Sequence, residues 1–151
     1  MWKNVDEALS GMVKEDGVLY LAGPYSHDLP QVRQWRHDEL SGCAGWFMRT
    51  GITVYSPISH THAIALSNKD MPVDWAFWEK HDRKMLQMCD GLLVLLLCGW
   101  NTSIGVTAEI EIAKEMEMPI FWVRKNVSEW SRYMVKTGGP PDFVGYACGS
   151  E

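Results

Sequence analysis

An uninterrupted apolar run at residues 91–97, with the sequence GLLVLLL, limits the fold more than any other feature. Apolar residues without polar alternation are typical of a strand that is covered on both faces, as in parallel sheets flanked by helices. A polar loop at 99–103 follows the run, and a helix is expected to open at Gly105 and Val106. Ligands of such sheets bind outside the carboxyl ends of the strands, beside helix N-termini with free N–H groups.

The rest of the chain alternates between strand-like and helix-like segments. We expect strands at 18–22, 52–55 and 119–123, and helices at 31–50, 74–89 and 126–136. A long polar loop is expected at 58–72, a short helix or loose arm at 1–16 and a tail at 138–151. This order predicts the α/β class: one domain spanning residues 1–151, with a small, doubly wound, mostly parallel sheet.

Composition narrows the class of protein. The formal net charge of −5 argues against the wrapping of polymeric nucleic acid, which needs basic stripes. We expect no membrane span, because no apolar run reaches about 18 residues. The first residues lack the layout of a secretion signal. The cysteines contain no Cys-x-x-Cys pair and are predicted to be reduced core thiols of a cytoplasmic protein; they are Cys43, Cys89, Cys98 and Cys148.

Glu109 falls within an apolar helical stripe. At 100° per residue, the stripe consists of Val106, Ile110, Ala113 and Met116. An inward carboxylate costs free energy unless it is paired, hydrogen-bonded or used. In the first helical turn, the helix dipole would favour its ionised form, which is suited to act as a nucleophile. The alternative is an acid that helps its helix to start.

Asp82 repeats this pattern on the helix predicted at 74–89, for which Asp74 is the expected cap. It lies between Trp78 and Met85 on the inward face. A purely structural role remains the alternative for this residue. Two acids near one pocket would separate each other's proton affinities, which is how acid and nucleophile roles are assigned.

The sequence predicts neither a metal nor a cofactor. His60 and His62 form an i, i+2 pair without further ligands, which is a weak metal pattern, so His60 is expected to face the substrate or solvent. The segment 99–105 has neither the paired glycines nor the lysine of a nucleotide-binding fingerprint.

Three segments together resemble the nucleoside 2-deoxyribosyltransferase family. They are YLAGPYS at 20–26, EKHDRKMLQMCD at 79–90 and SIGVTAE at 103–109, and they occur in that family's order and spacing within 18–123. The resemblance implies a small flavodoxin-like fold and the cleavage or transfer of N-glycosidic bonds of nucleosides or nucleotides. It also implies a homodimer or larger homo-oligomer.

The resemblance also implies roles for individual residues. Glu109 matches the nucleophile that attacks the anomeric carbon, Asp82 the aspartate that assists at the base or sugar, and Tyr20 a tyrosine beside the nucleophile. Ser103 and Gly105 match the loop that receives the 5′ end of the sugar.

The form Ser-x-Gly-Val-x-x-Glu is closer to the nucleotide N-hydrolase branch, which favours a 5′-monophosphate over a free nucleoside. That branch often carries an arginine in the loop after the first strand. This chain has none there, and His27 or Arg33 are the candidates to replace it.

Together, the residues and the resemblance predict a site for a (deoxy)nucleoside or its monophosphate. An aromatic wall would stack on the base, and backbone amides at a helix N-terminus would hold the 5′ end. The expected binding residues are Gly23, Pro24, Tyr25, Ser26, His60, Asp74, Trp75, Trp78, Asn101, Ser103, Gly105 and Val106. The alternatives are a nucleotide-binding sensor or interaction module without turnover, and a structural oligomer built on the eight tryptophans.

Overall fold

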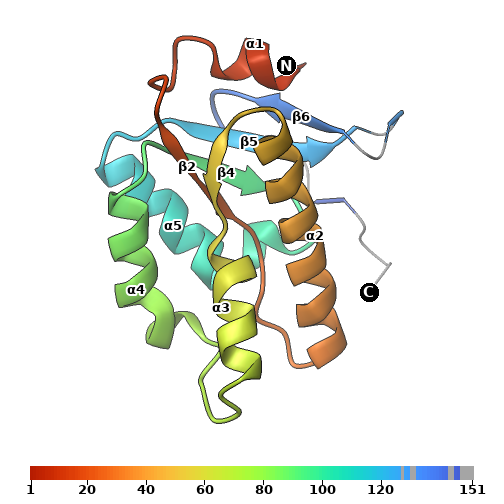
Figure 1. Cartoon of the computed structure of the whole chain (residues 1–151), viewed down its shortest axis with the longest axis vertical. Coiled ribbons are helices and arrows are strands. Elements are labelled where there is room, and N and C mark those ends of the chain that lie inside the picture. Colours follow the sequence, from red (N-terminus) through yellow and green to blue (C-terminus); the bar gives the residue numbers. More distant parts are fainter. Residues whose placement is uncertain (127, 130–131, 143–144, 147–151) are drawn as a thin grey trace.

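A computed structural model describes residues 1–126, 128–129, 132–142 and 145–146. Within them, six strands form one sheet in the order β1-β6-β5-β4-β2-β3, with helices on both faces (Figure 1). The strands are β1 (Trp2–Lys3), β2 (Val18–Ala22), β3 (Thr53–Tyr55), β4 (Gly91–Leu95), β5 (Ile120–Lys125) and β6 (Tyr133–Lys136). The helices are α1 (Val5–Leu9), α2 (Pro30–Arg49), α3 (Pro57–Leu66), α4 (Trp75–Gln87), α5 (Ile104–Glu115) and a short 3₁₀ helix, η1 (Trp100–Thr102).

The adjacent strands β5, β4, β2 and β3 are parallel, as predicted. On β4, Leu93 is paired with Leu21 of β2 on one side and with Phe121 of β5 on the other. β6 runs antiparallel beside β5, and β1 runs antiparallel beside β6. The apolar run is fully buried from Leu92 to Leu97, because helices cover both faces of the strand.

The chain reverses its direction of winding at β2. It first passes through α2 to β3 on one side of β2 and then crosses to β4 on the other side. The parallel strands therefore have the flavodoxin-like order, in which the crevice between the carboxyl ends of β2 and β4 is the usual place for a ligand.

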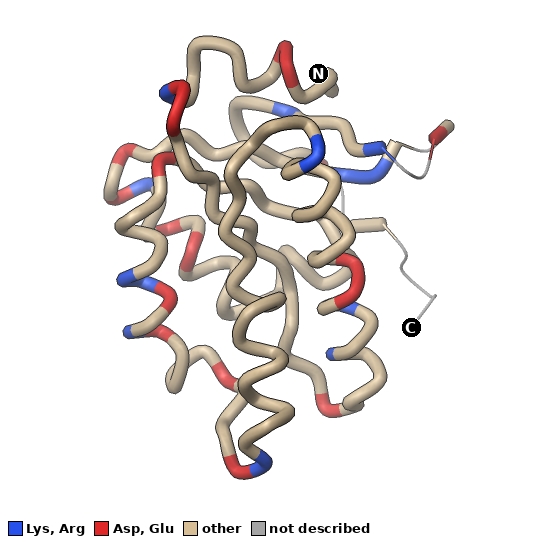
Figure 2. The backbone as a smooth tube through the Cα atoms, in the orientation of Figure 1, with Lys and Arg blue, Asp and Glu red and all other residues tan. Residues whose placement is uncertain are grey.

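Side chains of β2 pack alternately into two separate hydrophobic cores, one on each face of the sheet. Leu19 and Leu21 pack on the α2 side with Phe47, whereas Tyr20 and Ala22 pack on the side of α4 and α5. Charged residues occupy the helices and the periphery, while β2 and β4 carry none (Figure 2). In the described part of the chain, no helix combines the length and apolarity that a membrane crossing requires.

The helices that surround the crevice begin at well-defined caps. The Asp74 carboxylate accepts a hydrogen bond from the Phe77 amide at 3.0 Å, which confirms the predicted cap of α4. The Ser103 hydroxyl oxygen accepts a hydrogen bond from the Val106 amide at 3.2 Å and caps α5. Pro30 opens α2 at a position where a proline needs no N–H partner.

Two predicted segments were wrong. The expected loop at 58–72 contains helix α3, because Pro57 presets the first helical position and buried His62 packs against Gln34 and His37 of α2. The expected helix at 126–136 contains strand β6 instead. Tyr133 and Val135 are buried while their neighbours are partly exposed, which is the two-residue period of a strand.

Both ends of the chain contain more regular structure than the sequence predicted. The N-terminal arm includes both β1 and α1, and the described part of the tail includes a bridge between Tyr146 and Leu97.

Cys43 and Cys89 are free, as expected. Cys98 is disulfide-bonded, contrary to the prediction of four reduced thiols. Cys148 lies outside the described residues.

Candidate functional site

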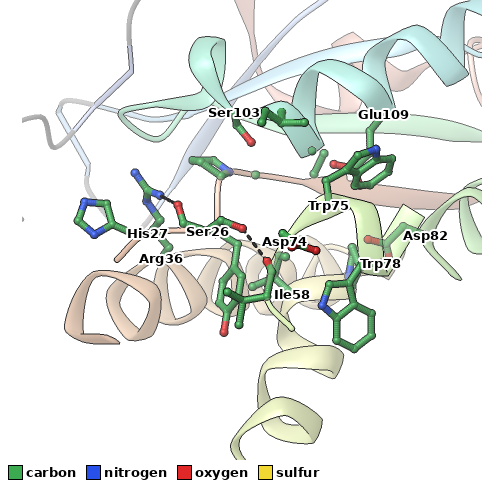
Figure 3. Close-up of a pocket in the computed structure, with 18 of the residues that line it drawn as sticks. Ser26, His27, Arg36, Ile58, Asp74, Trp75, Trp78, Asp82, Ser103 and Glu109 are labelled. Atoms are coloured by element: carbon green, nitrogen blue, oxygen red, sulfur yellow. Dashed lines mark hydrogen bonds between the residues drawn. The ribbon is translucent and has the colours of Figure 1, made fainter. Parts of the chain in front are cut away.

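A cavity of about 410 Å³ lies at the crevice between the carboxyl ends of β2 and β4. Its walls come from the loop after β2, from α3 and from the beginnings of α4 and α5. Figure 3 shows Glu109, Asp82 and two tryptophans toward one end, and Arg36, Ser26 and His27 toward the other. The cavity therefore has an acidic end and a basic end.

Glu109 lies in the second turn of α5, not in the first turn as predicted, because the helix begins at Ile104. Its side chain lines the cavity and the residue is only 6% exposed. Burial raises the pKa of Glu109 to about 8; the charge of Asp82 raises it too, whereas the Tyr20 hydroxyl lowers it. Burial therefore opposes the ionised form that the helix dipole was predicted to favour.

Tyr20 lies next to Glu109, on the face of β2 that α4 and α5 cover. It is fully buried and does not line the cavity. Its hydroxyl makes no hydrogen bond of ordinary geometry within the described residues. Burial and the neighbouring carboxyls of Glu109 and Asp82 raise the pKa of Tyr20. Its hydroxyl proton is therefore retained and can be donated to Glu109.

Asp82 reaches the cavity from α4, which packs beside α5. Burial raises the pKa of Asp82, and a hydrogen bond with His81 opposes this rise. The two inward acids that periodicity predicted on separate helices thus share one cavity. Both have proton affinities above the ordinary value for a carboxyl group.

Arg36 forms part of the opposite end. This arginine of α2 is buried, and its guanidinium donates hydrogen bonds to the carbonyl oxygens of Ser26 at 2.9 Å and Cys98 at 3.5 Å. Gly99 makes room for it, because a Cβ atom there would lie 3.0 Å from Arg36 Nη2. The φ of +95° at Gly99 also favours glycine. These contacts hold a positive charge beside the loops after β2 and β4.

The N-terminus of α5 adds polar groups to the cavity wall through Ser103, Ile104 and Gly105. The first amides of a helix have no acceptor within the helix, and they carry partial positive charge. Among the described residues, the amides of Ile104 and Gly105 make no hydrogen bond. This wall is suited to an anionic or oxygen-rich group.

Trp75 and Trp78 supply an apolar wall near the two acids. The Trp78 indole N–H donates to the Pro72 carbonyl oxygen at 2.9 Å, which fixes the ring. Trp75 lies 3.5 Å from where a Cβ atom of Gly105 would be, so the helix backbone passes close to the ring. A planar group can pack on such a wall.

Residues 17–125 match the model of a family described as a domain of unknown function, DUF1937. The chain belongs to this family. The matched segment of this DUF1937 member runs from β2 through β5 and includes all residues that line the cavity. A search of curated proteins finds no match. The family description names no activity, so the resemblance to nucleoside 2-deoxyribosyltransferases stays a prediction.

Most of the predicted site residues come together. Those that line the cavity are Gly23, Pro24, Tyr25, Ser26, Asp74, Trp75, Trp78, Asp82, Ser103, Gly105 and Glu109. Tyr20 and Val106 are buried beneath it and do not line it. His60 and Asn101 are exposed and lie outside its walls, because His60 is on the outer side of α3 and Asn101 is in η1.

Sequence reasoning missed Arg36 and the apolar lining from α3, which includes Ile58. Arg36 stands one helical turn from Val32 and from Leu40, both buried, so its inward position was visible in the spacing. Of the two suggested replacements for a loop arginine, His27 lines the cavity and Arg33 does not.

His62, the second histidine of the weak metal pattern, has both ring nitrogens engaged by other side chains. Its Nδ1 is 2.5 Å from the Tyr25 hydroxyl and its Nε2 is 3.0 Å from the Gln34 carbonyl oxygen. That oxygen is an acceptor, so Nε2 carries the proton and the Tyr25 hydroxyl donates to Nδ1. Within the described residues, no group of three or more potential metal ligands is present.

Proposed function

We propose that this protein cleaves or transfers the N-glycosidic bond of a (deoxy)ribonucleoside or its 5′-monophosphate, with Glu109 as the nucleophile. The observation that carries the proposal is the pair of buried carboxyls, Glu109 and Asp82, that share one cavity beside a tryptophan wall. Cleavage of this bond develops positive charge at the anomeric carbon, which an adjacent carboxylate stabilises or traps.

The residues can be assigned to a balanced reaction. Glu109 attacks the anomeric carbon and forms an ester with the sugar while the bond to the base breaks. The leaving base takes the proton of Asp82. Water, or an acceptor base, then attacks the anomeric carbon, Asp82 recovers a proton from the attacking group, and the Glu109 carboxylate is released.

The protonation states are compatible with these roles. With the pKa of Glu109 at about 8, the pair holds at least one proton at neutral pH. The reaction needs that proton on Asp82 and the negative charge on Glu109. The positive charge that develops on the sugar favours this arrangement, because it stabilises a carboxylate beside it in a dry site.

The basic end of the cavity supports the 5′-monophosphate as substrate. Arg36 lies across the cavity from the two acids, and the Ser103 hydroxyl and the first amides of α5 belong to the wall between them. A phosphate on the 5′ carbon would reach this end while the anomeric carbon faces Glu109. Charge-assisted hydrogen bonds from an arginine and a helix N-terminus are strong ligands for phosphate.

Incubation with a panel of nucleosides and 5′-monophosphates, with free base followed by chromatography, tests the proposal. We expect base release from at least one monophosphate and its loss in Glu109→Gln. Glu111→Gln, an exposed glutamate on the same helix, is the matched control. Mass spectrometry of acid-quenched protein should detect the sugar ester. If the wild-type protein releases no base from any member of the panel, the proposal fails.

A second candidate is a nucleotide-binding module without turnover. The raised pKa of Glu109 favours it, because a protonated carboxyl can donate a hydrogen bond to a bound ligand instead of attacking it. Calorimetric binding of a monophosphate without release of base would select this candidate.

A further inference from the structure

The loop after β2, which supplies a continuous part of the cavity wall, is tied to its surroundings at two adjacent residues. The Ser26 carbonyl oxygen accepts a hydrogen bond from Arg36 of α2 at 2.9 Å. The Ser26 hydroxyl donates to the Val73 carbonyl oxygen, just before α4, at 2.7 Å (Figure 3). The Tyr25 hydroxyl donates to His62 Nδ1 of α3 at 2.5 Å. The position of this part of the wall therefore depends on α2, on α3 and on the segment before α4.

Side chains of α2 hold the His62 ring in place. The residue is only 5% exposed, and its ring stacks on that of His37 with centroids 4.3 Å apart. His62 Nε2 donates to Gln34 Oε1 at 3.0 Å, and the Gln34 amide donates in turn to the Asp38 carboxylate at 2.9 Å. All donors of this series point away from the cavity, so each bond polarises the next. His62 Nδ1 is therefore a fixed acceptor for the Tyr25 hydroxyl.

We propose that His62 is a positioning residue that holds the Tyr25 side chain, and through it the loop after β2, in the arrangement that binds the substrate. This inference rests on the proposed function and deepens it, because the same loop carries the carbonyl that holds Arg36. His62 does not line the cavity, so it acts through Tyr25, which does. A wall that is ordered before the ligand arrives lowers the entropy cost of binding.

The protonation states of the two side chains suit this contact. Burial raises the pKa of Tyr25, and nearby Arg33 offsets only part of the rise, so the hydroxyl keeps the proton that it donates. Burial and the neighbouring His37 lower the pKa of His62. The imidazole is therefore neutral at neutral pH, and its Nδ1 is free to accept.

The substitution Tyr25→Phe removes the hydroxyl and keeps the ring. For the 5′-monophosphate of the panel that wild-type protein binds most tightly, we expect Kd from calorimetry and KM to rise about fivefold. We expect kcat within about twofold of wild type, because Glu109 and Asp82 belong to α5 and α4. His62→Asn keeps an acceptor for the hydroxyl and should retain wild-type Kd. Exposed His60→Leu on the same helix is the control and should retain it too.

A double-mutant cycle separates positioning from direct contact between the Tyr25 hydroxyl and the substrate. His62→Leu removes the acceptor, and water can replace it at Gln34, which is exposed. If the hydroxyl acts through His62, Tyr25→Phe raises Kd in the wild-type background and not further in His62→Leu. An equal rise in both backgrounds means direct contact and overturns the inference.

Hydrogen exchange of the ligand-free protein tests the contact without His62→Leu, in case that variant does not fold. The loop amides after β2 should exchange faster in Tyr25→Phe than in wild type, because one of the ties of the loop is gone. Unchanged exchange overturns the inference. If wild-type protein binds a monophosphate and releases base, and Tyr25→Phe has the same Kd, only the positioning role fails. If wild-type protein neither binds a monophosphate nor releases base, the proposed function fails, and the positioning role fails with it.

Discussion

Glu109 of α5 and Asp82 of α4 face the same cavity, and the charge of Asp82 adds to burial in raising the pKa of Glu109. The two carboxyls therefore titrate as a coupled pair. Which of them holds the last proton decides whether the site can act.

The pH profile of the reaction should show this coupling. We expect kcat/KM to be bell-shaped, with an alkaline limb near pH 8 where the pair loses its last proton. In Asp82→Asn, the pKa of Glu109 should fall because the neighbouring charge is gone. The slower residual activity should then rise with pH to a plateau, without the alkaline limb. Initial rates from pH 5 to 9 check this, and an alkaline limb that survives in Asp82→Asn would contradict the pairing.

Glu109→Gln should stabilise the protein at alkaline pH. The pKa of Glu109 is raised from 4.5 to about 8 in the fold. Between these values the unfolded chain is ionised while the folded protein keeps its proton, so wild-type stability falls as pH rises through this window. We expect the advantage of Glu109→Gln in the free energy of unfolding to grow by roughly 3 kcal/mol from pH 5 to pH 8.

Urea unfolding at the two pH values measures the effect of Glu109→Gln. Glu111→Gln on the exposed side of α5 should show no such growth. An equal difference between wild type and Glu109→Gln at both pH values would mean that Glu109 is not desolvated.

Arg36→Lys should separate monophosphates from nucleosides. A lysine keeps the charge but cannot hold the Ser26 and Cys98 carbonyls and a phosphate together. We expect KM for a 5′-monophosphate to rise roughly tenfold, with little change for the matching nucleoside. Arg33→Lys is the control, because Arg33 lies on the same helix and does not line the cavity. An equal rise in KM for the monophosphate and the nucleoside would mean that Arg36 does not bind the phosphate.

His62 should make the fold sensitive to acid. Burial lowers the pKa of His62 below 6.5, and the nearby His37 and Arg33 lower it further, while Asp38 opposes them. The unfolded chain therefore takes up a proton at higher pH than the folded protein does, and stability is lost as pH falls below about 6.5. In His62→Asn, the Tyr25 hydroxyl keeps an acceptor, but this loss should disappear.

Thermal unfolding of wild type and His62→Asn at pH 7.5 and 5.5 measures this dependence. Exposed His60→Asn serves as the comparison and should retain the wild-type loss. If wild type and His62→Asn lose the same stability between pH 7.5 and 5.5, a titratable group other than His62 causes the loss.

Helical spacing was sufficient to predict that Asp82 and Glu109 face inward, and the inward position of Arg36 could have been found in the same way. The loops were harder to interpret. Periodicity did not distinguish α3 from a polar loop, because two of its buried residues are polar: His62 packs against α2 and Thr61 lines the cavity.

The sequence by itself determined the class of fold, the buried central strand and the side of each helix that faces the sheet, because these follow from local spacing and from burial of apolar surface. The tertiary structure decided which side chains meet: that the two acids share a cavity, that Arg36 lies across from them, and that His60 lies outside. It also raised the pKa of Glu109, which disfavours the ionised form expected from the sequence. Proton affinity depends on how completely neighbouring elements exclude water, and that is a property of long-range packing.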